Sequence, residues 1–119
     1  MAYSKQLNSW LYSDQPKTPV ILIADDDPSI RLLLRHAMEK EGFDVLEVVN
    51  GLEAIQAVEE HQPALVLMDA VMPEMDGFAA TSTLLEINEY RDLPVLIITS
   101  LDDDQSVARA FQSGAIDYI

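Results

Sequence analysis

The sequence has no cysteine, few basic residues and no long apolar run, and each absence excludes a class of protein. Without cysteine the chain can form no disulfide, no thiolate zinc site and no cysteine nucleophile. With 7 Lys and Arg against 21 Asp and Glu, the formal net charge is −14. That charge disfavours direct binding to nucleic acid or anionic membranes, because their phosphates would be repelled. The apolar runs, such as residues 20–24, are far too short to span a bilayer, and the N-terminus lacks a signal-peptide core. We therefore expect a cytoplasmic protein.

Length and hydrophobic content favour one folded domain. The 119 residues suffice for a single domain, and 49% of them are hydrophobic and grouped in blocks. Residues 1–18 differ, because they are polar, mixed in composition and interrupted by proline. We therefore expect a leader or linker over residues 1–18 and the folded domain over residues 19–119.

From residue 20 onward, apolar runs alternate with helical patterns. Continuous runs rich in Val and Ile, typical of parallel strands covered on both faces, span residues 20–24, 64–68 and 94–99. Weaker strands are predicted over residues 43–49 and 115–119. Helices are predicted between them, over residues 28–41, 52–61, 78–88 and 104–113. This order predicts an α/β fold with a doubly wound, five-stranded parallel sheet and helices on both faces.

Capping residues and apolar stripes define the first two helices. Asp27 is the predicted N-cap of the first, and Asn50 has capping-box spacing to Glu53 at the start of the second. The stripe predicted to face the sheet from the first helix is Ile30, Leu33, Leu34, Ala37 and Met38. The corresponding stripe of the second helix is Leu52, Ile55 and Val58.

Acidic and hydroxyl side chains follow three of the predicted strands. The first strand ends in Asp25, Asp26 and Asp27, the third in Asp69 and the fourth in Thr99. The carboxyl ends of parallel strands share one edge of a sheet, where functional crevices lie. Clustered carboxylates repel one another unless a cation joins them, and oxygen ligands with room for water and phosphate suit Mg²⁺. Asp27 alone is explained as a helix cap.

These segments resemble, in order, the receiver domains of two-component response regulators. Residues 21–28 are similar to the first strand and acidic pair of that family, and residues 65–77 to its phosphoacceptor segment with Met-Pro and Asp-Gly. Residues 94–100 resemble its fourth strand, and residues 114–119 resemble the approach to its fifth. The resemblance covers residues 20–119 and implies the flavodoxin-like strand order 2-1-3-4-5. It also implies a signalling switch, not an enzyme with a turnover substrate.

The resemblance implies a phosphoacceptor and a cofactor site. Asp69 would accept a phosphoryl group, acting as a carboxylate nucleophile. The cofactor would be Mg²⁺, held by Asp25, Asp26 and Asp69 and by the backbone carbonyl of Val71. The phosphoryl donor would be a sensor histidine kinase or a phosphotransfer protein.

Further residues are matched to the switch. Thr99 would bind the phosphoryl group, Tyr118 would turn inward on activation, and Met72 and Pro73 would shape the loop after the acceptor. The family also has a catalytic lysine after the fifth-strand aromatic residue and a final helix, and neither has a counterpart in this sequence. We therefore expect a receiver domain that is incomplete at its C-terminal side.

The sequence also leads to expectations about the output domain and the oligomeric state. The segment from Thr99 to Tyr118 is similar to receivers that precede diguanylate cyclase or phosphodiesterase domains, so one of these is the expected output. Without a final helix, the first helix alone would have to cover one face of the sheet, and apolar area there would be left bare. Either the leader, through Trp10, Leu11 and Tyr12, or a second copy of the chain in a homodimer would cover it.

A haloacid-dehalogenase-like phosphatase is the alternative from the sequence. Its nucleophile would be Asp25 and its general acid Asp27, after the same apolar strand. This alternative leaves Asp69 unexplained and lacks the downstream lysine that such enzymes need. The two histidines, His36 and His61, are interpreted as surface residues, not as phosphotransfer groups.

Overall fold

Parallel strands and helices alternate along the chain. The computed structural model describes residues 18–98, 108, 112–115 and 117–118. Its strands are β1 (Val20–Ala24), β2 (Asp44–Val48), β3 (Leu65–Asp69), β4 (Val95–Ile98) and β5 (Asp117–Tyr118). Its helices are α2 (Pro28–Lys40), α3 (Gly51–His61), α4 (Gly77–Glu86) and the 3₁₀ helix η1 (Asn88–Tyr90). No helix in these ranges is long and apolar enough to cross a membrane.

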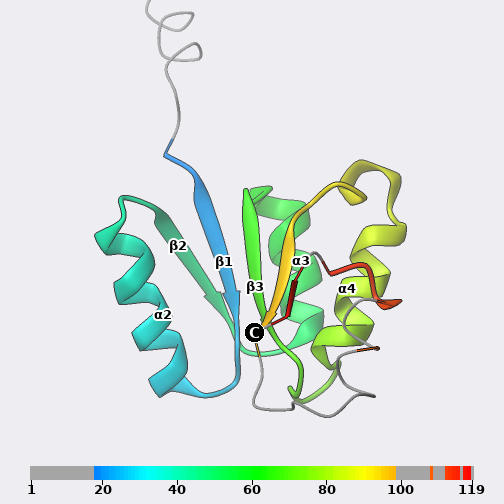
Figure 1. Ribbon diagram of the computed structural model, residues 1–119, viewed down its shortest axis with the longest axis horizontal. Coiled ribbons are helices and arrows are strands. Elements are labelled where there is room, and N and C mark those ends of the chain that lie inside the picture. Colours follow the sequence, from blue (N-terminus) through cyan, green and yellow to red (C-terminus); the bar gives the residue numbers. More distant parts are fainter. Residues whose placement is uncertain (1–17, 99–107, 109–111, 116, 119) are drawn as a thin grey trace, which may run out of the picture.

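The strands form one parallel sheet in the order β2-β1-β3-β4-β5. This is the flavodoxin-like α/β arrangement expected from the sequence, with β3 between β1 and β4 (Figure 1). The backbone of β5 is described over two residues only. The expected count of five strands rests on this short β5 and, like the absence of a last helix, stays a prediction. Most of the helix expected over residues 104–113 lies outside the described residues.

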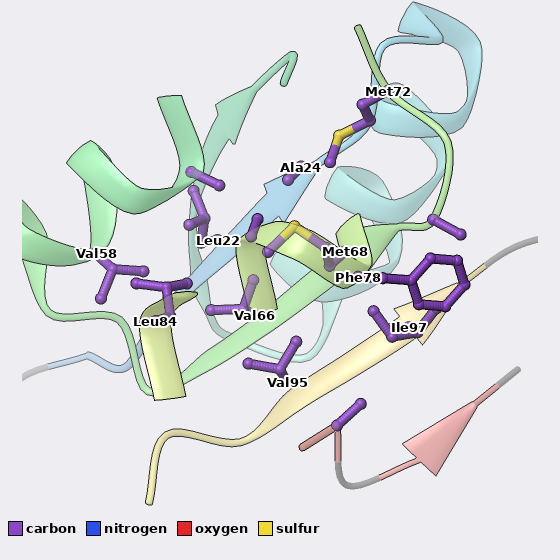
Figure 2. Close-up of a cluster of buried hydrophobic side chains, with 14 of the residues drawn as sticks. Leu22, Ala24, Val58, Val66, Met68, Met72, Phe78, Leu84, Val95 and Ile97 are labelled. Atoms are coloured by element: carbon purple, nitrogen blue, oxygen red, sulfur yellow. The ribbon is translucent and has the colours of Figure 1, made fainter. Parts of the chain in front are cut away.

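Two apolar clusters lie on opposite faces of the sheet, because successive side chains of a strand point to opposite sides. The larger cluster contains Leu22 and Met68 and is covered by α3 and α4, with Val58 and Leu84 pointing into it (Figure 2). The smaller contains Ile21, Ile23 and Leu67, and α2 covers it from the other side of the sheet (Figure 1).

The stripe predicted on α2 is only partly correct. Leu34 and Met38 pack on the smaller cluster, but Leu33 is 66% exposed, Ile30 is at the border of exposure, and α2 has no buried residue. The reason is that α2 packs mainly on β1 and β2, at one side of the sheet, among the residues that the structure describes. A single line of side chains then reaches the strands, and the rest of the stripe faces outward.

The stripe predicted on α3 is also displaced. Val58 is fully buried and Ile55 packs partly buried on the core, but Leu52 is 51% exposed. The buried residues of α3 are instead the small residues Gly51, Ala54 and Ala57, together with Val58. These small side chains let α3 pack against both β1 and α4, and Leu52 lies outside the packed face.

The predicted helix starts are close to those in the structure. The Asp27 carboxylate accepts a hydrogen bond from the Ser29 N–H at 2.8 Å and caps α2. Asn50 caps α3 through the Glu53 N–H at 2.8 Å, although the Glu53 carboxylate accepts from Val49 and not from Asn50. α3 begins at Gly51, one residue before the predicted start.

Candidate functional site

Three aspartates meet at the carboxyl-terminal edge of the sheet. β1 and β3 are neighbours with Ala24 opposite Met68, so the next residues, Asp25 just after β1 and Asp69 at the end of β3, lie side by side. Asp26 follows directly. One carboxylate oxygen from each aspartate lies within 4.8 Å of the other two. The sequence-predicted residues Asp25, Asp26 and Asp69 are therefore brought together, and this trio is called the acidic cluster below.

The three carboxylates have different surroundings. Asp25 is buried, its N–H donates to the Val48 carbonyl at 3.1 Å, and its carboxylate accepts from the Asp27 N–H at 2.9 Å. Asp69 is half-buried at the end of β3, and Asp26 is exposed. The cluster thus has a fixed inner side and an open outer side.

Burial first, and then the negative charge of Asp25, raise the pKa of Asp69 to about 6, against hydrogen bonds from the backbone N–H groups of Val71 and Ala70 that lower it. Burial also raises the pKa of Asp25. Without a cation, ionisation of Asp25 and Asp69 is therefore unfavourable. Three carboxylate oxygens at this spacing are a donor set that fits a hard divalent cation.

The raised pKa of Asp69 predicts an unusual pH dependence of stability in the metal-free chain. An acid whose pKa is higher in the folded state destabilises that state once ionised, so its cost is absent below about pH 4 and complete above about pH 6. Allowing for solvent screening, Asp69→Asn should stabilise the metal-free chain by about 1–2 kcal/mol at neutral pH.

Urea unfolding of both proteins in chelator, from neutral to acidic pH, measures this difference. The difference in unfolding free energy between the two proteins should shrink as the pH falls toward the pKa of an ordinary aspartate. A difference that stays constant, or grows on acidification, would contradict the unfavourable ionisation of Asp69.

The loop after Asp69 is held by its backbone. Met72 is buried in the larger cluster (Figure 2), whereas Pro73 and Val71 are exposed. The Gly77 N–H donates to the Ala70 carbonyl at 2.9 Å, which closes the loop onto the start of α4. Met72 thus anchors the loop in the core, whereas Pro73 lies on its outer side.

Gly77 is required where α4 meets β3. A Cβ atom added there would lie 2.0 Å from the backbone oxygen of Asp69. The sequence analysis used Gly77 only as part of the Asp-Gly motif, and the available signal was its place directly after Asp76, the N-cap of α4. The close approach sets the position of Asp69 relative to α4.

Arg31 is a second residue that the sequence analysis missed. Its Nη1 donates to the backbone carbonyl of Asp25 at 2.8 Å, and its Nε donates to Glu47 at 3.2 Å. The signal available in the sequence was a basic residue in the first turn after an acidic triplet. Arg31 thus contacts the main chain between the first two members of the acidic cluster.

Other predicted residues lie apart from the cluster or outside the described residues. Thr99 lies outside them, although its predecessor Ile98 pairs with Asp69 in the sheet. For Tyr118 only the backbone is described, in β5. His36 and His61 are exposed, at the surface positions expected for them.

Two curated proteins similar to this chain are transcriptional regulators. RpaA of Synechocystis sp., a DNA-binding dual master transcriptional regulator, is 38% identical over 101 residues, which are 85% of this chain and 42% of that protein. The transcriptional regulatory protein SrrA of Staphylococcus aureus is 37% identical over 99 residues, 83% of this chain and 40% of that protein. The chain thus spans about two-fifths of the length of these relatives.

Solved structures share the fold, and a family model matches the sequence. A putative response regulator from Chloroflexus aurantiacus aligns with a TM-score of 0.82 and 27% identity, covering 87% of this chain and 84% of that one. The signal receiver domain of a histidine kinase from Syntrophus aciditrophicus aligns with a TM-score of 0.80 and 36% identity, covering 86% and 77%. The model of the response regulator receiver domain matches residues 21–119. Together with the acidic cluster at the sheet edge, this match shows that the chain belongs to the response regulator receiver domain family.

Proposed function

We propose that this chain is a phospho-accepting switch in which Asp69 takes a phosphoryl group from a histidine kinase or a phosphotransfer protein. Mg²⁺ would be held by Asp25, Asp26 and Asp69 and by the backbone carbonyl of Val71. The observation that carries the proposal is the approach of three carboxylate oxygens to within 4.8 Å at the ends of neighbouring strands.

The chemistry follows from the position of Asp69. A carboxylate oxygen forms a bond to phosphorus while the bond from phosphorus to the donor's imidazole nitrogen, or to an acyl oxygen, breaks and its electron pair leaves with the donor. The surrounding chain holds the nucleophile in place, since Asp69 ends a strand that is paired on both sides. Bound Mg²⁺ would supply positive charge against the repulsion between the phosphoryl group and the acidic cluster.

The switch would be read through residues beyond Asp69. Thr99 is proposed to bind the phosphoryl group and Tyr118 to respond to it. The added charge and acceptor oxygens would bias this region between two arrangements. The family match extends to the positions of both residues.

The phosphatase alternative is not supported. The Asp27 carboxylate accepts the Ser29 N–H as the cap of α2, which accounts for it structurally. Residues 21–119 match the receiver family. The proposed receiver function gives Asp69 a role, whereas the phosphatase alternative gives it none.

The output remains open to proposal. The two curated relatives described above are transcriptional regulators, so we favour an output that controls transcription over the diguanylate cyclase or phosphodiesterase expected from the sequence. Since the chain is too acidic to bind DNA well itself, another part of the parent protein would make that contact.

Phosphoryl mapping tests the proposed function. After prolonged incubation with acetyl phosphate and Mg²⁺, mass spectrometry of the digested chain should find one phosphoryl group, on the peptide containing Asp69. Chelation of Mg²⁺ should prevent uptake. Beryllofluoride, which mimics a phosphoryl group, should bind under the same Mg²⁺ requirement. Label on another residue, or undiminished label in chelator, would refute the proposal.

A further inference from the structure

We propose that Arg31 is a positioning residue for the acidic cluster, which fixes the peptide joining Asp25 to Asp26 and thereby sets the placement of the Asp26 carboxylate. This inference rests on the proposed function, because it concerns binding of the divalent cation at the same site. It assigns a role to a side chain that would not itself contact the cation.

The guanidinium of Arg31 is held at two points. Nη1 donates to the Asp25 carbonyl at 2.8 Å, and Nε donates to the Glu47 carboxylate at 3.2 Å. The Arg31 side chain is 18% exposed and that of Glu47 is 24% exposed, so both groups are largely withdrawn from water. A planar guanidinium suits such two-point binding, because its donors are fixed relative to one another.

Three elements are connected through this contact. Arg31 lies in α2, Glu47 in β2, and the accepted carbonyl belongs to the residue that follows β1. Glu47 also pairs with Arg35, one turn further along α2, but through its other carboxylate oxygen, so the Arg31 contact does not depend on Arg35. The hydrogen bond from Arg31 to Glu47 keeps the Arg31 guanidinium directed at the Asp25 carbonyl.

The held carbonyl controls Asp26 through covalent geometry. The C=O of Asp25 and the N–H of Asp26 belong to one planar peptide unit, so fixing that carbonyl fixes the direction in which the chain continues. The Asp25 side chain has an additional restraint from the Asp27 N–H. Asp26 is exposed, and among residues 18–98 no side-chain hydrogen bond restrains its carboxylate. Its placement therefore depends on the peptide that Arg31 holds.

Charge and positioning predict opposite effects of removing Arg31. As a cation close to the site, Arg31 repels a second cation, so its loss would strengthen Mg²⁺ binding if charge alone mattered. As a positioning residue, its loss would weaken binding, because Mg²⁺ demands near-ideal octahedral geometry from its ligands. The direction of the change thus separates the two roles.

A Mg²⁺ titration of the unphosphorylated chain, followed by amide chemical shifts, provides the test. Arg31→Met should raise the dissociation constant about tenfold, as is typical when a residue that orients a metal ligand is lost. The matched control is Arg35→Met. It removes one positive charge from the same helix, and a partner of the same Glu47, but leaves the hydrogen bond from Arg31 to the Asp25 carbonyl in place. It should leave binding unchanged or slightly tighter. Equal binding by the two variants, or tighter binding by Arg31→Met, would overturn the inference.

Arg31→Lys keeps the charge but replaces the fork with a single ammonium, so it should also weaken binding. It carries the test if urea unfolding shows that Arg31→Met does not fold. The controls also separate this inference from the proposed function. A wild-type chain that binds no Mg²⁺ would refute both. If wild type binds, Asp26→Asn weakens binding and the Arg31 variants do not, only the role of Arg31 is refuted.

Discussion

Asp69→Asn is expected to reduce phosphoryl uptake to background, whereas Asp27→Asn is expected to retain it. An amide is not a nucleophile toward phosphorus, so the first change removes the acceptor while keeping its shape. The second keeps the cap of α2, because Asn and Asp are about equally good at an N-cap. Incorporation from acetyl phosphate with Mg²⁺, measured by intact mass, compares the two variants with wild type.

The stability of both variants provides the control. Asp69→Asn should fold, since it relieves an unfavourable charge, and Asp27→Asn should unfold at nearly the same urea concentration as wild type. Uptake that persists in Asp69→Asn and disappears in Asp27→Asn would reverse the assignment of the nucleophile. It would then favour a phosphatase-like use of the first acidic triplet.

Gly77→Ala is expected to cause the largest loss of stability among the single methyl additions considered for this chain. The new Cβ would lie 2.0 Å from the Asp69 oxygen and 2.9 Å from the Met68 side chain, in a place bounded by main chain. Since backbone cannot turn aside as a flexible side chain can, α4 or the end of β3 must move. We expect a loss of about 3 kcal/mol in the free energy of unfolding, measured in urea, and slower uptake at Asp69.

Gly42→Ala is the matched control for this substitution. Gly42 has a positive φ of 94°, but a Cβ there would meet no atom within 4 Å. Its cost should therefore be only the strain of a left-handed alanine, about 1–2 kcal/mol, with uptake at Asp69 unchanged. If Gly77→Ala is no more destabilised than Gly42→Ala, the contact with β3 does not constrain the site.

The sheet and the acidic cluster could be predicted because both depend on local sequence. Continuous apolar runs identify strands such as β1 and β3 without knowledge of the rest of the fold. Parallel strands share the edge at which they end, so the residues after them, Asp25 and Asp69, had to be neighbours once the strands paired. The caps Asp27 and Asn50 also act within three residues of themselves.

Features that depend on tertiary placement could not be predicted in the same way. The periodicity of a helix gives the width of its apolar stripe but not which part of it meets the sheet, so Leu33 and Leu52 were assigned to the wrong side. The contact of Arg31 with Glu47 joins residues 16 apart in sequence, and no local pattern specifies it. The need for glycine at residue 77 arises only when α4 packs on β3.

The proposed site of phosphoryl uptake lies at the end of a strand that is paired on both sides. Met68 pairs with Ala24 on one side, and Asp69 itself pairs with Ile98 on the other. Gly77 packs closely against the backbone carbonyl of Asp69. A new charge on such a side chain cannot be relieved by backbone displacement of β3 without breaking the ladders on either side. Any response to the proposed phosphoryl group must therefore come from segments outside these ladders, with the central strand as their fixed support.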